Sequence, residues 1–186
     1  MEEIKRLKRD LIHKGNIISF YEDTMQIPNG NVVKWDFVAH QGAAAIVAVR
    51  DDGKLIMVRQ YRNALERVTL ELPAGCVDYP GEPGIDAARR ELMEETGFTA
   101  DSFELLISIY TTVAFCNEKI DIYVAKGLKP GEQDLDEDEY INVEAYDLNE
   151  LCRMIYACEI QDSKTVAAIM AYKNTLTSEA IQKSAY

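Results

Sequence analysis

The first half of the chain carries short apolar runs separated by turn residues, and this pattern predicts β-strands. The runs expected to be strands are 17–27, 32–38, 42–49 and 54–61. The turn 28–31, Pro-Asn-Gly-Asn, separates the first two runs and is a strong hairpin signal. The third run is apolar throughout, which suits a strand buried on both faces. Strands joined by short turns favour an antiparallel or mixed sheet over repeated βαβ units.

The stretch 73–84, which is rich in proline and glycine, breaks the strand pattern, and a helical period follows it. Ile85, Ala88 and Leu92 recur at the spacing of one helix face. Gly97 stands where a residue with left-handed backbone would end the helix. This segment therefore predicts one helix in the middle of the chain.

The rest of the chain predicts two more strands followed by two helices. The strands are expected at 102–112 and 119–124. Asp147 opens a short helix, and a last helix begins near Ser163, with the tail after Thr177 frayed. Strands first, one central helix and two terminal helices together predict an α+β fold.

Composition and charge exclude several functions. The 186 residues, 47% hydrophobic and 28% charged, fit one globular domain. Acidic residues number 32 against 20 basic ones, which gives a net charge of −12. The one basic cluster, 5–9, is a short terminal patch that we expect to be solvated. This balance argues against nucleic-acid and membrane partners, and an anionic substrate would need a local cation to offset it.

The chain also lacks the marks of membrane insertion, export and zinc binding. Its longest apolar run, 43–49, is far shorter than the roughly 20 residues that cross a bilayer. The charged N-terminus has no apolar signal region, so a cytoplasmic location is expected. The 4 cysteines form no CxxC pair and there are only 2 histidines, which argues against zinc and favours reduced thiols.

Three glutamates of the predicted central helix are the strongest chemical signal. Glu91, Glu94 and Glu95 stand at i, i+3 and i+4, so a helix places them on one face. Hard divalent cations prefer oxygen ligands, and the cluster therefore suits a metal site. The alternative is a solvated acidic face. Arg90 is adjacent and can pair with Glu82 across the preceding loop.

The segment around these glutamates resembles a known signature. Residues 75–98, GCVDYPGEPGIDAARRELMEETGF, are similar to the motif of the Nudix hydrolases, which cleave nucleoside diphosphates linked to another moiety with Mg²⁺ or Mn²⁺. The family usually has one residue fewer between the first glycine and the first glutamate than the six that separate Gly75 from Glu82. The extra residue lengthens the loop and leaves the register of the helix unchanged.

The resemblance extends over residues 14–175 and is closest to the ADP-ribose pyrophosphatase branch, on the segments 60–62 (QYR), 71–75 (ELPAG) and 136–139 (DEDE). It implies an α/β/α sandwich with a mixed central sheet over residues 41–186. It also implies a small antiparallel β-sheet over residues 1–40 that is exchanged between the subunits of a homodimer.

The resemblance also implies roles for individual residues. The metal ligands would be the Ala74 carbonyl, Glu91, Glu94 and Glu95, with Mg²⁺ or Mn²⁺ as the ion. Glu95 would act in catalysis, and Glu137 or Glu139 would orient or deprotonate the attacking water. Arg62, Glu118 and Trp35 would contact the substrate. Trp35, on one strand face with Phe37, suits core or dimer packing as well as base stacking.

The implied activity is hydrolysis of ADP-ribose to AMP and ribose 5-phosphate. Val113 and Ala114 stand where ADP-ribose-specific relatives usually have a Pro-Gly turn, so we expect this loop to lack a rigid turn. A related nucleotide sugar such as GDP-mannose is therefore the alternative substrate. A nucleotide-sugar sensor without catalysis is a further alternative, which the retained glutamates disfavour.

Overall fold

The computed structural model describes residues 3–135 and 139–184, and the chain divides into two compact units. The N-terminal unit comprises Met1–Gly42 and Tyr110–Lys119, and the core unit comprises Ala43–Ile109 and Ile120–Tyr186. The N-terminal unit therefore takes in a segment from the middle of the sequence. The assignment of residues 1–40 to dimerisation stays a prediction.

The N-terminal unit is built on a three-stranded antiparallel sheet in the order β1-β2-β3. Its strands are β1 (Lys5–Lys14), β2 (Ser19–Gln26) and β3 (Val32–Ala39). The predicted hairpin joins β2 to β3, with Gly30 at φ +85° in its turn. The basic cluster 5–9 belongs to β1, which the sequence did not predict, and its residues are exposed as expected. Arg9 pairs with Asp23 at 2.6 Å and lies 3.7 Å from the ring centre of Phe37.

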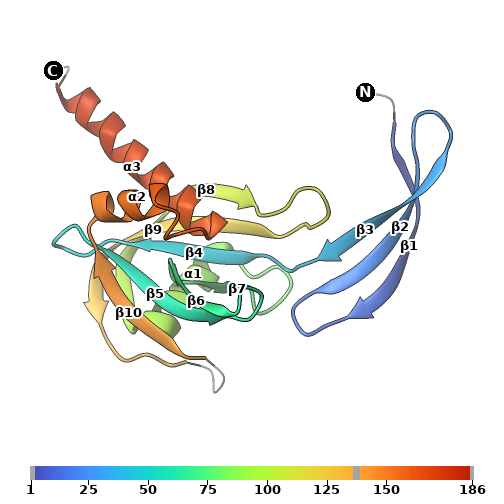
Figure 1. Cartoon of the computed structure of the whole chain (residues 1–186). Coiled ribbons are helices and arrows are strands. Elements are labelled where there is room, and N and C mark those ends of the chain that lie inside the picture. The colour runs from blue at the N-terminus through green and yellow to red at the C-terminus, as the bar shows by residue number, and fades with distance from the viewer. Residues whose placement is uncertain (1–2, 136–138, 185–186) are drawn as a thin grey trace. The chain divides into compact units, whose positions relative to one another are not determined.

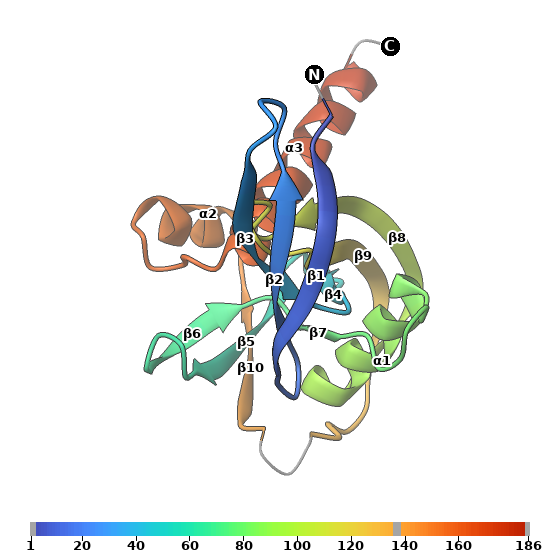
Figure 2. The same cartoon turned by 90° about the vertical axis from the view of Figure 1, so that its right-hand side faces the viewer.

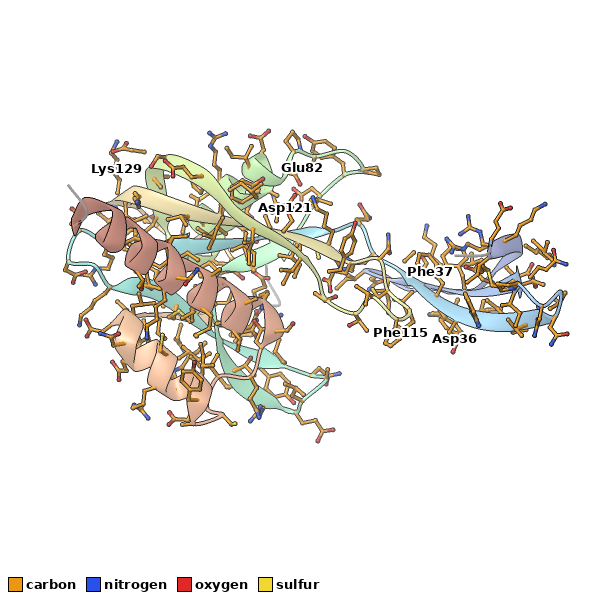
Figure 3. All side chains as sticks on the ribbon, turned by 90° about the horizontal axis from the view of Figure 1, so that it is seen from above. Asp36, Phe37, Glu82, Phe115, Asp121 and Lys129 are labelled. Carbon is orange, nitrogen blue, oxygen red and sulfur yellow. The ribbon has the colours of Figure 1, made fainter. Side chains whose placement is uncertain are left out.

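Residues 110–119 lie beside the outer edge of β3 in this unit. The Val38 N–H donates to the Phe115 carbonyl at 2.7 Å, and the Asn117 N–H donates to the Val38 carbonyl at 3.3 Å. Figure 3 shows Phe115 close to the strand that carries Asp36 and Phe37. The segment thus extends the sheet beyond the three strands that the hairpin pattern defines.

The core unit contains seven strands and three helices among the described residues. They are β4 (Ala43–Ala48), β5 (Leu55–Arg62), β6 (Arg67–Glu71), β7 (Ala74–Cys76), α1 (Gly84–Thr96), β8 (Phe98–Tyr110), β9 (Lys119–Pro130), β10 (Ile141–Tyr146), α2 (Leu148–Tyr156) and α3 (Ser163–Ser184). One sheet has the order β7-β4-β9-β8 and the other the order β10-β5-β6. Strand β4 runs parallel to β9 and antiparallel to β7, so the larger sheet is mixed.

Helices cover both faces of the mixed sheet (Figures 1 and 2). Alternate residues of β4 serve opposite faces. Ala45 and Val47 pack in the cluster that contains α2 and α3 residues, whereas Ala44 and Ile46 pack in the cluster that contains Ala88 of α1. The expected α/β/α sandwich with a mixed central sheet is confirmed.

The central helix has the bounds and the termination that the sequence predicts. Gly97 adopts φ +71° and its N–H donates to the Met93 carbonyl, which caps α1. Ala87, Ala88 and Leu92 are fully buried and anchor the helix on the sheet. Its remaining face carries the glutamates. Helix α3 continues beyond Thr177 to Ser184, and the expected fraying of this tail stays a prediction.

Within the described part of the chain, no helix has both the length and the apolar content needed to span a membrane.

Candidate active site

The first feature of the site is the contact between α1 and the short strand β7. A Cβ atom built on Gly75 would lie 2.1 Å from the carboxylate carbon of Glu91. The Glu91 carboxylate therefore lies directly against the Gly75 backbone, and any side chain at position 75 would displace it. Glycine is required here for close approach, independently of its φ angle.

Glu95 lies one helical turn further along α1 and is almost fully buried. Its side-chain Oε2 accepts a hydrogen bond from the Ala74 N–H at 2.9 Å. Its backbone carbonyl accepts a bond of 2.5 Å from Gln133 Nε2. The residue is 3% exposed, so its carboxylate has lost nearly all contact with water. Helix α1 thus brings Glu91 and Glu95 to residues 74 and 75.

Arg90 lies among the acidic groups of this face. Its Nη1 donates to Glu91 Oε1 at 2.7 Å and to Glu94 Oε2 at 2.9 Å. Its Nη2 donates to the Cys76 carbonyl at 2.8 Å and lies 3.7 Å from Glu82 Oε2. The predicted pairing with Glu82 is therefore present but is longer than the contacts to the helix glutamates. Burial lowers the pKa of Arg90, yet the charge of Glu91 and hydrogen bonds to the glutamates raise it overall.

The single positive charge of Arg90 does not offset the negative charges of Glu91 and Glu95 that are buried in this site. Burial, reinforced by the negative charges of Glu94 and Glu139, raises the pKa of Glu91 to about 7. Burial also raises the pKa of Glu95 to about 8, with Glu91 and Glu139 adding to the effect. Both carboxylates are therefore held in a place that favours an added cation.

These residues fit a divalent metal. Within residues 3–135 and 139–184, no three acidic, cysteine or histidine side chains are grouped closely enough to hold a metal ion, and Arg90 bonds both Glu91 and Glu94. The donors are nevertheless hard oxygens, and those of Glu91 and Glu95 are like-charged and buried against the backbone of Gly75 and Ala74. That chemistry suits Mg²⁺ or Mn²⁺ and does not suit a soft metal.

Arg62, at the end of β5, is held by Glu71 at the end of β6. Its Nε and Nη2 donate to the two carboxylate oxygens at 2.8 and 2.7 Å. Its positive charge also interacts with Glu95. Burial alone would raise the pKa of Glu71, but hydrogen bonds from Arg62, Lys164 and Thr69 and the charge of Lys164 lower it to about 2. Arg62 was predicted to contact the substrate, whereas Glu71 was not predicted as a site residue, although it is part of the ELPAG segment.

Glu137 and Glu139 are the two candidates for activating the attacking water. The structure describes Glu139, whereas Glu137 lies outside the described residues. Glu139 precedes β10, and its charge acts on both Glu91 and Glu95. It therefore belongs electrostatically to the same site.

Trp35 and Glu118 belong to the N-terminal unit, whereas the other predicted site residues belong to the core unit. Trp35 is 45% exposed and lines a groove of about 610 Å³. The remaining residues of that groove are Phe20, Lys34, Asp36, Val38, Ala114 and Phe115. Glu118 accepts a hydrogen bond from Thr111 Oγ1 at 2.6 Å, and His40 Nε2 lies 3.6 Å from its other oxygen.

The segment that lacks the family's Pro-Gly pair still forms a turn. The Thr112 carbonyl accepts hydrogen bonds from the N–H groups of Phe115 at 3.3 Å and Cys116 at 3.0 Å. Val113 projects into solvent with 83% of its surface exposed. Hydrogen bonds to Thr112 thus replace the conformational restriction that proline and glycine would supply.

Comparison with known proteins agrees with this architecture. The sandwich and the buried glutamates of α1 fit the class of metal-dependent hydrolases. The NUDIX domain model matches residues 39–168, and the chain belongs to the Nudix family. A methanol dehydrogenase activator from Bacillus methanolicus is 40% identical over 90% of this chain and 91% of its own length.

Two further relatives share the name ADP-ribose pyrophosphatase. The protein from Bacillus subtilis is 38% identical over 90% of this chain and 91% of its own length. The one from Mycobacterium tuberculosis is 34% identical over 91% of this chain and 83% of its own length. A crystal structure of an ADP compounds hydrolase superposes with a TM-score of 0.85 over 96% of this chain and 97% of that chain. Its 23% identity supports the fold alone.

Proposed function

We propose that this protein hydrolyses the diphosphate bond of ADP-ribose and releases AMP and ribose 5-phosphate. The observation that carries the proposal is the burial of Glu91 and Glu95 against residues 74 and 75. The substrate assignment is supported by the 38% identity to the Bacillus subtilis ADP-ribose pyrophosphatase. Because the protein is strongly acidic, a dianionic diphosphate needs local positive charge, which this site is suited to collect.

Glu91, Glu94 and Glu95, together with the Ala74 carbonyl, would hold the metal, which we propose to be Mg²⁺ or Mn²⁺. When bound, the ions neutralise the diphosphate and lower the pKa of a water molecule. Glu82 keeps the loop before α1 folded, since its Oε2 accepts the Asp78 N–H at 2.7 Å.

Arg62 binds the diphosphate or the terminal ribose, and Glu139 takes the proton of the attacking water. The water oxygen bonds one phosphorus in line while the bridging oxygen leaves with the other phosphate. One product is AMP and the other is ribose 5-phosphate, and no covalent enzyme intermediate forms. Glu95 acts as a ligand, and the bound metal would favour its deprotonated form.

We further propose that two copies of the chain associate through the N-terminal unit, where Trp35 and Glu118 contribute to substrate binding. The support is the exposed apolar surface of this unit. Its members are Ile4, Leu7, Leu11, Ile12, Ile17, Ile18, Val32 and Trp35. An open sheet with this much exposed apolar surface is typical of a surface that another chain covers.

Chromatographic identification of nucleotide products tests the activity. The purified protein with Mg²⁺ is offered ADP-ribose, GDP-mannose, ADP-glucose, NADH and diadenosine polyphosphates. A kcat/KM highest for ADP-ribose, with AMP as product, supports the proposal. A preference for GDP-mannose would retain the metal chemistry and move the specificity to the loop of Val113 and to Arg62. Binding without turnover would identify a sensor.

A further inference from the structure

A buried network of charges lies beside Arg62 and includes Lys164, a residue from the first turn of α3. Lys164 is 8% exposed and its Nζ donates to Glu71 Oε2. The two residues are separated by 93 positions in sequence. A buried lysine costs free energy unless it is paired, so its place here needs a reason beyond packing.

The Glu71 carboxylate collects four donors from three side chains. Arg62 supplies two, Thr69 Oγ1 supplies one at 2.6 Å to Oε1, and Lys164 supplies one to Oε2. A carboxylate bonded on both oxygens has one orientation. Because its bond to Arg62 is bidentate, the plane of the guanidinium is fixed as well.

The bonds to Glu71 occupy only one edge of the Arg62 guanidinium, the edge formed by Nε and Nη2. In the described part of the chain, Nη1 of Arg62 has no hydrogen-bond acceptor, and the side chain is 38% exposed. Two N–H groups therefore remain for an anion. The charge of Arg62 also interacts with that of Glu95, so Arg62 is close enough to the glutamates of α1 to act on the same substrate.

A single ion pair with Glu71 would leave Arg62 with little net charge. Lys164 supplies the second positive charge, so Arg62, Glu71 and Lys164 together carry +1. Lys164 also bonds Asp162 Oδ2 at 2.9 Å. The start of α3 offsets part of the charge of Asp162, because the same oxygen accepts the Thr165 N–H at 3.0 Å and a helix N-terminus carries roughly +0.5 of an elementary charge.

The first turn of α3 also holds the chain that leads to Ala74. The Thr165 hydroxyl is fully buried and accepts the Leu72 N–H at 3.0 Å. Residues 71 and 72 are therefore fixed from the same helix by one charged contact and one neutral contact. The two contacts can be altered separately, which makes the role of the charge testable.

We propose that Lys164 is a positioning residue for the hydrolysis. It compensates the charge of Glu71, so that Glu71 orients Arg62 without neutralising its attraction for the substrate diphosphate. The inference rests on the proposed function, in which Arg62 binds that diphosphate. Lys164 itself touches no substrate and acts through Glu71 and Arg62.

Steady-state kinetics with ADP-ribose test the role of the charge. In Lys164→Gln and Lys164→Met, we expect KM to rise about tenfold while kcat stays within about threefold, since weakened binding of the diphosphate acts equally on bound substrate and transition state. Lys164→Arg should restore KM to within about threefold. Lys129→Gln is the matched control, because it removes an ion pair of the same kind, to Asp101, from an exposed position.

An unchanged KM in the folded Lys164→Gln or Lys164→Met protein would overturn the proposal. So would a loss confined to kcat, which would indicate a structural effect on α1. If the neutral variants do not fold, Thr69→Ala decides, since it removes a donor to the same carboxylate without leaving a buried charge unpaired. Its KM should rise about threefold, and an unchanged KM counts against the proposal.

Calorimetric titration with ADP separates this inference from the proposed function. If the parent protein binds ADP but does not hydrolyse ADP-ribose, the proposed function fails while the role of Lys164 can still be measured. The Kd for ADP should then be about tenfold higher in Lys164→Gln than in the parent. Equal Kd values, or no binding of ADP by the parent, would overturn the role of Lys164.

Discussion

The Ala74 N–H donates a hydrogen bond of 2.9 Å to Oε2 of Glu95, and this bond joins the strand β7 to the glutamate helix. The same residue pair contains two proposed metal ligands, the Ala74 carbonyl and the Glu95 carboxylate. An amide oxygen in place of the carboxylate could accept the same bond but would carry no charge. Position 95 therefore allows the fold and the metal chemistry to be tested separately.

We expect Glu95→Gln to fold like the parent and to lose activity by on the order of 100- to 1,000-fold. Added Mg²⁺ should raise the melting temperature of the parent more than that of the variant, because the variant binds the ion more weakly. Turnover and thermal unfolding, each with and without Mg²⁺, check both statements. Turnover by Glu95→Gln equal to that of the parent would show that the metal assignment is wrong.

Gly75→Ala should disable the site through a single methyl group. The added Cβ would lie 2.1 Å from the carboxylate carbon of Glu91, so this side chain must move away from the β7 backbone. We expect a fall in kcat/KM of about 100-fold, together with a weaker response to Mg²⁺.

Gly53→Ala is the control for this substitution. Gly53 has φ +81° with open space around the Cβ position, so the substitution strains the backbone but displaces nothing. The protein should become less stable by about 1 kcal/mol and retain its kcat/KM. If Gly75→Ala behaves in the same way, the contact with Glu91 has no functional importance.

The sequence predicted the central helix well because its signals are local. Ala88 and Leu92 recur with the helical period, and Gly97 caps the same segment. The spacing of the glutamates therefore fixed their common face. Strands β1, β6, β7 and β10 were missed, since β1 carries many charged residues and β7 has only three residues. Their conformations depend on pairing with distant strands.

The hydrogen bonds that hold Arg62 through Glu71 and Lys164 could not be predicted, for a related reason. Glu71 is nine residues from Arg62 and 93 residues from Lys164, and no sequence pattern connects these distances. A glutamate within ELPAG is equally compatible with an exposed strand end. Only the packing of α3 against the end of β6 shows that its carboxylate is buried and paired.

The depressed pKa of Glu71 predicts a loss of stability in acid. Its folded-state pKa is about 2, below the ordinary value of 4.5. The folded state therefore favours the ionised form, and the resulting stabilisation is complete above pH 4.5 and disappears as the pH falls toward 2. The difference corresponds to roughly 3 kcal/mol of unfolding free energy at neutral pH.

Urea unfolding between pH 7 and pH 2 measures this contribution. Glu71→Gln should be less stable than the parent at pH 7 by a few kcal/mol, and the difference should shrink as the pH approaches 2. Glu104→Gln, at an exposed position of β8, should follow the parent at every pH. A constant difference between Glu71→Gln and the parent would mean that the Glu71 charge does not account for the stabilisation.

The exposed apolar surface of the N-terminal unit predicts how the proposed dimer responds to a single added charge. Leu11, on the edge strand β1, is 53% exposed, and a second copy of the chain that covers it would bury it. We expect Leu11→Glu to shift the sedimentation coefficient from that of a dimer to that of a monomer, because the buried carboxylate would be unpaired. Leu65→Glu, at a position 56% exposed in the core unit, should remain dimeric.

Because Trp35 and Glu118 lie in the N-terminal unit, the dissociated protein should also show a raised KM for ADP-ribose. A dimeric Leu11→Glu protein would place the interface elsewhere, and a monomeric parent would leave the exposed apolar surface of β1 without the partner proposed for it.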